Sequence, residues 1–115
     1  MPFVDARIAT ELSDDQKETL KAELGQAVST FGKGEDFLMV GIADDYDLWL
    51  GGRKLEDGAY VSFSMIGDTP DGACAEFSAK VCDILNRVAG ISGDSVYITF
   101  HPMSAKRWGW NGSTC

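Results

Sequence analysis

The order of elements expected from the sequence repeats once along this chain of 115 residues. Residues 3–8, 37–42, 59–65 and 96–100 have the length and composition of strands, and an amphipathic helix is expected after Ser13 and again after Thr69. Equivalent elements lie about 55–60 residues apart, which indicates two strand–helix–strand units, at about residues 2–50 and 51–115. Each unit should pair its strands in parallel. The sequence therefore predicts one α/β (α+β) domain over residues 1–115, a four-stranded mixed sheet with two helices on one face.

The helix boundaries are signalled by capping residues and glycines. Ser13 and Gln16 have the spacing of a capping box. Thr69 is the expected N-cap of the second helix, with Pro70 at its first helical position. Glycines should end the helices, and the first helix has a single apolar stripe. The residues are Gly32, Gly34 and Gly90 at the ends, and Leu20, Leu24, Ala27, Val28 and Phe31 in the stripe.

One expected strand is apolar on both of its faces. In residues 37–42, Phe37 and Met39 alternate with Leu38, Val40 and Ile42, a pattern typical of a strand buried on both sides. Two helices can cover only one face of the sheet, so we expect another copy of the chain to cover the other. Two short segments, residues 48–50 and 108–110, are candidates for pairing with the sheet edges of neighbouring subunits.

Composition excludes several classes of function. The net charge of −8 argues against binding to nucleic acid or to an anionic membrane. No apolar run approaches the length of a membrane span, and no leader is visible, so a cytoplasmic protein is expected. The three cysteines have no metal-type spacing, and His101 is the only histidine. A chain without these ligands is expected to build no metal site, so any chemistry should use something other than histidine-based or metal-based machinery.

Pro2 is the candidate for chemistry that needs no cofactor. The initiator methionine is usually removed before a small residue, which would leave Pro2 with a free secondary amine. Phe3 and Val4 start a buried strand, so the amine is expected to lie inside the fold. Burial disfavours the charged form and lowers the pKa of an α-amino group from its usual value near ~8. A neutral Pro2 would be a general base, whereas retained Met1 would make its nitrogen an amide.

Several stretches carry a resemblance to a known family. They are Met1-Pro2, Gly32-Lys33, residues 64–67 (SMIG), residues 96–98 (VYI) and residues 108–114 (WGWNGST). With these stretches and the two units, the chain resembles the macrophage migration inhibitory factor (MIF) and D-dopachrome tautomerase family of the tautomerase superfamily. The resemblance implies a homotrimer with active sites between subunits, and a cofactor-free keto–enol tautomerase, an isomerase, for phenylpyruvate-like or dopachrome-like acids. It also allows a cytokine-like protein that binds a host receptor after leaderless secretion.

The resemblance also implies roles for individual residues. Pro2 would be the base, and Lys33 would bind the carboxylate of the substrate. The backbone N–H of Ile66, or of Met65 in another register, would bind the same group. The remaining positions are Tyr97, which would reach in from a neighbouring subunit, and two apolar walls, Phe37 and Trp110.

The residues themselves leave other interpretations open. Lys33 is also explained as a solvated lysine near a helix C-terminus, Tyr97 as an ordinary strand aromatic, and Phe37 as core packing. The chain departs from the family pattern at Phe37, where a tyrosine is usual, and it lacks the CxxC motif. Thr99 and Cys115 also replace family residues, an asparagine and an aromatic. Trp108 and Arg107 lie near the expected pocket and would either narrow it or bind an anionic group. Dehalogenation or decarboxylation on the same fold is a further alternative.

Overall fold

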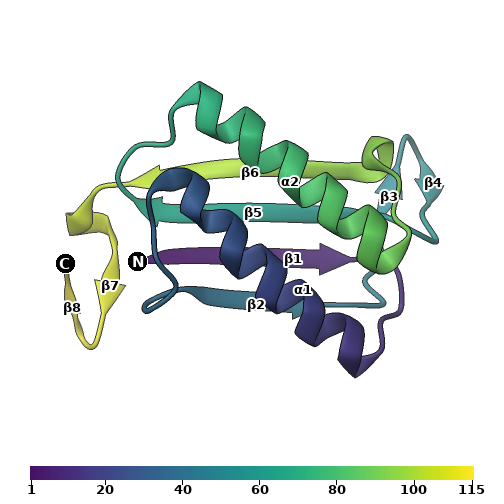
Figure 1. Cartoon of the computed structure of the whole chain (residues 1–115), viewed down its shortest axis with the longest axis horizontal. Coiled ribbons are helices and arrows are strands. Elements are labelled where there is room, and N and C mark those ends of the chain that lie inside the picture. The colour runs from purple at the N-terminus through teal and green to yellow at the C-terminus, as the bar shows by residue number, and fades with distance from the viewer.

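A four-stranded sheet carries both helices on one face in the computed structural model, which describes residues 1–115 (Figure 1). The strand order is β2-β1-β5-β6. The β1–β2 and β5–β6 pairs are parallel, and β1–β5 is antiparallel. The predicted mixed sheet and one-sided helix layer are confirmed. The elements are β1 (Pro2–Ile8), α1 (Asp14–Ala27), β2 (Met39–Ala43), β5 (Ala59–Ile66), α2 (Asp71–Ala89) and β6 (Val96–Met103).

The short elements form two separate hairpins and three 3₁₀ turns. β3 (Trp49–Leu50) pairs with β4 (Arg53–Lys54), and β7 (Gly109–Trp110) pairs with β8 (Ser113–Thr114). Both hairpins turn through two residues with positive φ, 58° and 81° at Gly51-Gly52 and 50° and 80° at Asn111-Gly112, as such tight turns require. Pairing of these segments with a neighbouring subunit stays a prediction. The 3₁₀ turns are η1 (Val28–Phe31), η2 (Gly93–Ser95) and η3 (Ala105–Arg107).

The first helix begins as predicted and the second does not. Ser13 and Gln16 make the reciprocal capping box, and Gly32 and Gly90 adopt the left-handed conformation at the ends of η1 and α2. The expected N-cap at Thr69 is wrong, because Pro70 itself is the N-cap, with ψ of 146° and no side-chain cap. The carbonyl of Pro70 accepts the N–H of Cys74 at 3.0 Å, so the first helical residue is Asp71.

Two strand boundaries also differ from the expected ones. β2 begins at Met39, because the N–H of Leu38 donates to the carbonyl of Glu35 at 3.1 Å and holds Phe37 in a turn. β6 continues beyond residue 100 to Met103 and includes Pro102. β6 is an edge strand in the sheet order, and an edge strand tolerates a residue without an N–H.

The core lies between the sheet and the helices, and the opposite face of the sheet is uncovered within the chain. A cluster of 17 buried side chains includes alternate residues of β1 and β5 together with the inner faces of α1 and α2. Phe37 and Met39 are 63% and 67% exposed, so residues 37–42 are not buried on both faces by this chain. Covering of the open face by another copy stays a prediction. Neither helix is long and apolar enough to cross a membrane.

Candidate active site

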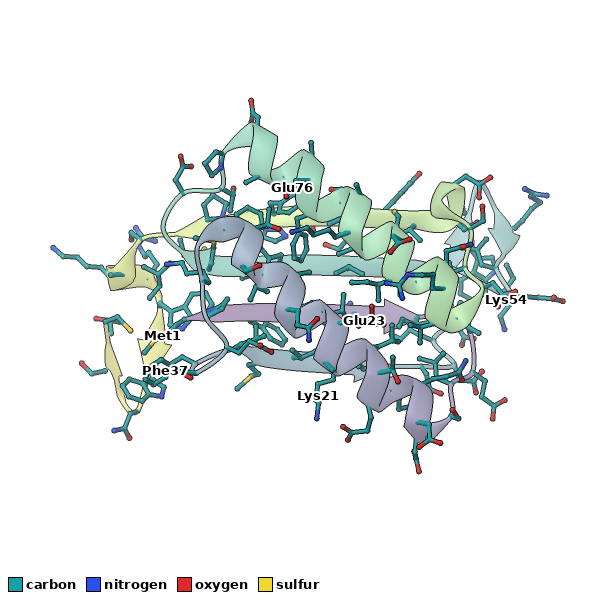
Figure 2. All side chains as sticks on the ribbon, viewed as in Figure 1. Met1, Lys21, Glu23, Phe37, Lys54 and Glu76 are labelled. Carbon is teal, nitrogen blue, oxygen red and sulfur yellow. The ribbon has the colours of Figure 1, made fainter.

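The N-terminal end of β1 opens into an apolar cavity of about 310 Å³. Three parts of the chain build it: the start of β1, the segment that leads into β2, and the C-terminal segment that contains β7. Figure 1 shows the N-terminus beside β7, and Figure 2 shows Met1 and Phe37 at the same end of the molecule. The lining residues are Met1, Pro2, Phe3, Phe37, Met39, Trp108, Gly109 and Trp110.

Pro2 is buried and is the first residue of a central strand. It lies opposite Met65 in the antiparallel β1–β5 register, and the start of a strand is where a proline is tolerated. Met1 precedes it, half-buried, and its Sδ lies 3.4 Å from the Sγ of Cys115, the last residue. Because the nitrogen of Pro2 is an amide while Met1 is attached, proton transfer at Pro2 requires the trimmed chain.

Phe37 and Trp110 form an aromatic rim to this cavity. Their ring centroids are 6.1 Å apart and the rings are nearly perpendicular, at 74°, an arrangement that aromatic pairs favour. Both side chains are largely exposed, Phe37 at 63% and Trp110 at 58%. Phe37 therefore does not belong to the core of the chain, and its ring is available to a bound molecule.

Lys33 and Ile66 lie near this end of the sheet but do not line the cavity. Lys33 follows Gly32, which has φ of 70°, and it begins the loop that leads to Phe37. It is half-buried and takes part in none of the seven ion pairs of the chain. Ile66 ends β5 one residue beyond Met65, the residue opposite Pro2. The ammonium of Lys33 and the backbone N–H of Ile66 are therefore both at the end of the sheet where Pro2 lies.

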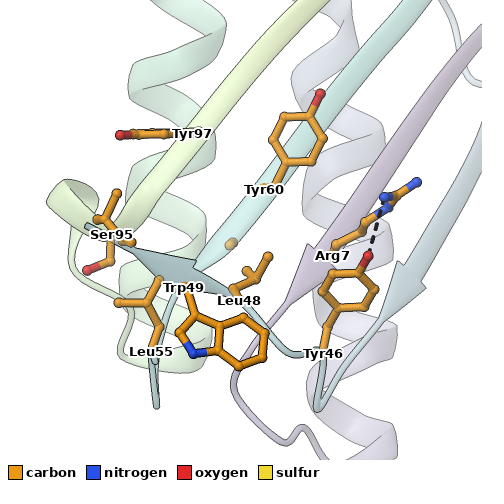
Figure 3. A pocket seen from close by; sticks show the side chains of 10 residues that line it. Arg7, Tyr46, Leu48, Trp49, Leu55, Tyr60, Ser95 and Tyr97 are labelled. Atoms are coloured by element: carbon orange, nitrogen blue, oxygen red, sulfur yellow. Dashed lines mark hydrogen bonds between the residues drawn. The ribbon is translucent and has the colours of Figure 1, made fainter. Parts of the chain in front are cut away.

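Tyr97 lies at the other end of the sheet from Pro2. It pairs with Tyr60 on β5, five residues from Met65, which corresponds to about 17 Å along a strand. The side chain is 64% exposed and lines a second cavity, of about 290 Å³, beside the β3–β4 hairpin (Figure 3). Tyr97 therefore cannot contact Pro2 of its own chain. Its predicted contribution from a neighbouring subunit stays a prediction.

The second cavity combines apolar side chains with one held arginine. The guanidinium of Arg7 donates to the hydroxyl of Tyr46 at 3.5 Å and lies 5.7 Å above the centre of that ring (Figure 3). The carboxylate of Asp5, and then the Tyr46 hydroxyl, raise the pKa of Arg7 above its usual value. Arg7 thus stays charged and is fixed in place against the aromatic ring.

Polar side chains continue along the open face of the sheet. The hydroxyls of Tyr60 and Thr99 are hydrogen-bonded at 2.7 Å, and the Thr99 hydroxyl lies 2.9 Å from Nε2 of His101. No group of three or more histidine, cysteine or acidic side chains is arranged to bind a metal ion. The side chains at this face are therefore suited to hydrogen bonding.

The sequence did not identify Phe3 and Met39 as cavity residues. They are register partners in the parallel β1–β2 pair, so they lie side by side on the open face next to Pro2. The alternation of side chains in each strand, combined with that pairing, was the signal that could have found them. Arg107 is exposed and does not line the cavity, whereas Trp108 does.

The comparisons with known proteins agree with this fold and this chain length. The sequence profile described as macrophage migration inhibitory factor (MIF) matches residues 1–115, the whole chain. The chain belongs to the MIF family. MIF from Mus musculus is 32% identical over 95 residues, which cover 83% of this chain and 79% of the mouse protein. The family resemblance drawn from the sequence is confirmed.

Solved structures show the same architecture for this MIF-family chain. The crystal structure of Leishmania major MIF2 is 25% identical, with a TM-score of 0.87 that covers 100% of this chain and 97% of that one. A fused 4-OT, solved as an asymmetric trimer, shares the fold with a TM-score of 0.83 at 15% identity, over 97% and 94% of the two chains. The fold is that of the MIF and tautomerase superfamily.

Proposed function

We propose that this MIF-family protein is a cofactor-free keto–enol tautomerase, an isomerase for phenylpyruvate-like or dopachrome-like acids. The observation that supports it most is the place of Pro2, which is buried at the start of β1 and lines an apolar cavity. An amine in such a site loses the hydration of its charged form, so its pKa falls and the neutral base is present at physiological pH. General bases work best when their pKa lies near the operating pH.

The reaction needs only one proton carrier. After removal of Met1, the neutral nitrogen of Pro2 accepts a proton from the carbon next to the ketone, and the carbonyl oxygen takes up the electron pair as an enolate. The protonated nitrogen of Pro2 then gives its proton to the enolate oxygen, which forms the enol and restores the neutral amine, and the reverse sequence returns the ketone. The ammonium of Lys33 would hold the substrate carboxylate through a charge-assisted hydrogen bond, and the N–H of Ile66 would bind the same group. Phe37 and Trp110 would stack against an aryl group.

The proposed active form is a homotrimer in which a neighbouring copy covers the open face. The exposed Met39, Trp49 and Tyr97, at 67%, 60% and 64%, favour a partner on this side. Tyr97 of that copy would bring its hydroxyl to the substrate. Tyr97 of the same chain as Pro2 lies at the other end of the sheet and cannot do so. The fused 4-OT, which shares the fold, was solved as a trimer.

Replacement of Pro2 tests the mechanism. Intact-mass measurement first establishes that Met1 is absent, and kinetics with phenylpyruvate and its 4-hydroxy analogue follow. We expect Pro2→Gly to lower kcat/KM at least about ten-fold, within the range known for loss of a general base. Pro70→Ala, at the N-cap of α2, is the matched control and should retain wild-type kinetics. Unchanged turnover in Pro2→Gly would remove Pro2 from the mechanism.

The names of the relatives favour a second function, signalling through a host receptor. MIF from Mus musculus is 32% identical to this chain. This function would require secretion of the protein. Receptor binding measured with wild type and with Pro2→Gly separates the two functions. Binding retained by an inactive Pro2→Gly protein would support signalling, and absence of binding by the wild type would exclude it.

A further inference from the structure

The open face of the sheet carries two charged side chains, and these two are paired with each other. In each strand, the residues that alternate with the core residues point to this face. Asp5 and Arg7 are the charged ones among them, and their side chains form an ion pair at 3.4 Å. His101 on β6 also lies on this face, and it is the only histidine of the chain. Histidine is the side chain that ordinarily changes its charge between about pH 5 and 8.

The hydrogen bonds around His101 are satisfied by a neutral ring. Its Nε2 lies 2.9 Å from the Thr99 hydroxyl, which lies 2.7 Å from the hydroxyl of Tyr60. A neutral imidazole fits this chain of hydrogen bonds in either tautomer, because Nε2 can accept the proton of Thr99 or donate its own. Protonation adds a positive charge and a further N–H donor, but no acceptor. The hydrogen bonds therefore accommodate the neutral ring and offer the imidazolium no counter-charge.

No carboxylate on the open face is placed to pair with His101. The register partner of His101 on β5 is Ser64, and the partner of Ser64 on β1 is Phe3. Asp5 lies two strands away from β6, roughly 10 Å across the sheet, and it is already paired with Arg7. A positive charge at His101 would therefore remain uncompensated on this face.

The surrounding elements add no negative charge at His101 either. The other titratable groups of β5 and β6 on this face are the hydroxyls of Tyr60 and Tyr97, and tyrosines are neutral at physiological pH. The helix α2 packs on the opposite face of the sheet (Figure 1). The turn η3, which follows β6, adds two exposed positive side chains, Lys106 and Arg107. Asp68 lies beyond the end of β5 and accepts the N–H of Thr69 at 2.9 Å, and His101 takes part in none of the seven ion pairs.

We propose that protonation of His101 opposes assembly of the chain, so that the oligomer is stable at neutral pH and dissociates in mild acid. This proposal rests on the proposed homotrimer, in which neighbouring copies cover the open face. Covering this face removes water from His101, and an imidazolium without a counter-charge then loses hydration and is repelled by the same charge in the other copies. Because Tyr97 of a neighbouring copy completes the proposed active site, dissociation would also dismantle that site.

The direction of the pH dependence follows from proton binding. The assembled form binds fewer protons than the separate chains, up to three fewer per trimer. Assembly is therefore at its strongest where histidine is neutral, above about pH 8, and it weakens as the pH falls toward about 5. Activity alone cannot report this effect, because acid also protonates the amine of Pro2.

Sedimentation velocity over a dilution series, at about pH 8 and about pH 5.5 and at one ionic strength, gives the protein concentration of half-assembly. We expect this concentration to rise at least about ten-fold in acid for wild type and less than about two-fold for His101→Gln, which cannot become charged. His101→Lys is charged at both pH values and should need at least about ten-fold more protein than wild type at pH 8. Ala22→Lys is the matched control, because it adds the same charge at an exposed position of α1 in the helix layer and should assemble as wild type does.

The outcomes separate this proposal from the tautomerase function. Equal half-assembly concentrations of wild type at the two pH values, or the same pH effect in His101→Gln, would overturn the proposal. If assembly responds to pH only when His101 is present, but the trimer turns over no keto acid, the tautomerase function falls and this proposal stands. If wild type turns over phenylpyruvate and His101→Gln keeps the pH effect, this proposal falls alone. A chain that is monomeric at both pH values contradicts the proposed trimer and this inference together, and should His101→Lys fail to fold by circular dichroism, wild type and His101→Gln give the decision.

Discussion

Phe31 connects the core to the loop that carries Lys33 and Phe37, which makes it a test of how the fold positions the site. It is the last residue of η1, and the left-handed Gly32 follows it directly. Its ring contacts three core phenylalanines, with centroid distances of 4.8, 5.4 and 5.9 Å to Phe63, Phe77 and Phe100. Phe31→Ala would remove this anchor two residues before Lys33.

The structure sets the expected cost of this change. Truncation of a buried phenylalanine to alanine costs roughly 3–5 kcal/mol, and aromatic pairs add ~0.5–1.5 kcal/mol beyond their buried area. Because Phe31 is half-buried but makes three such contacts, we expect its loss to lower the free energy of unfolding by about 2–4 kcal/mol. We also expect the KM for phenylpyruvate to rise several-fold with little change in kcat. The loop would position Lys33 less well, while Pro2 stays fixed in β1.

Phe77→Ala is the matched control. Phe77 is fully buried, lies on α2 and stacks on Phe63 at 5.0 Å, so its loss should destabilise the protein at least as much. It carries no loop of the site, so KM should be unchanged. Urea unfolding at one fixed protein concentration gives the free energies, because oligomer stability depends on concentration. Equal KM values in the two variants, or a destabilisation below about 1 kcal/mol in Phe31→Ala, would refute this reasoning.

Three further changes test separate features. Ser13→Ala removes the side-chain acceptor of the capping box and should destabilise the protein by about 1 kcal/mol in urea unfolding. Lys33→Gln should raise the KM for phenylpyruvate about ten-fold and leave kcat nearly unchanged, because it removes a contact made equally by substrate and transition state. The N–H of Leu12, and then Lys17, lower the pKa of Asp44. The ionised carboxylate therefore stabilises the fold above pH ~4, and this contribution is lost as the pH falls through the lowered pKa. Asp44→Asn should show a lower Tm than wild type at pH 7, with the difference shrinking below pH ~4.

A specific result would contradict each of these three predictions. Wild-type stability in Ser13→Ala would mean that the capping box is not needed for α1. A fall in kcat for Lys33→Gln at unchanged KM would place Lys33 in the chemical step. A difference in Tm between wild type and Asp44→Asn that stays constant from pH 3 to pH 7 would show that the charge of Asp44 does not stabilise the fold.

The fold could be predicted from the sequence because its signals are local. The capping residues, the glycines that end helices, and the length of each apolar run specify the elements, and the order of the elements then specifies the sheet. The predictions that were wrong concern element boundaries, where a proline or a turn outweighs the helix or strand propensity of the residues around it. Pro70 is the N-cap because its ψ is extended, and Phe37 lies outside its expected strand because the N–H of Leu38 bonds the carbonyl of Glu35 in a turn. The division into units at about residues 50 and 51 stays an interpretation.

The site could be predicted only in part, because its walls come together from distant parts of the chain. Pro2 was predicted from the sequence itself, and Phe37 and Trp110 from the family resemblance. The structure brings all three to one cavity. Phe3 and Met39 enter it through strand pairing, and no pattern within either segment marks them as cavity residues. The place of Trp108 depends on the packing of the C-terminal segment against the N-terminus. Contacts between segments that are far apart in the chain leave no repeating pattern of residues in the sequence.

The central claim is that trimmed Pro2 carries a neutral amine at physiological pH. Nuclear magnetic resonance of protein labelled with ¹⁵N-proline, after mass spectrometry has established the loss of Met1, follows the titration of that nitrogen directly. The account predicts a pKa at least about one unit below the usual α-amino value near ~8. A Pro2 nitrogen that titrates at the usual value would contradict the account, even with the fold unchanged.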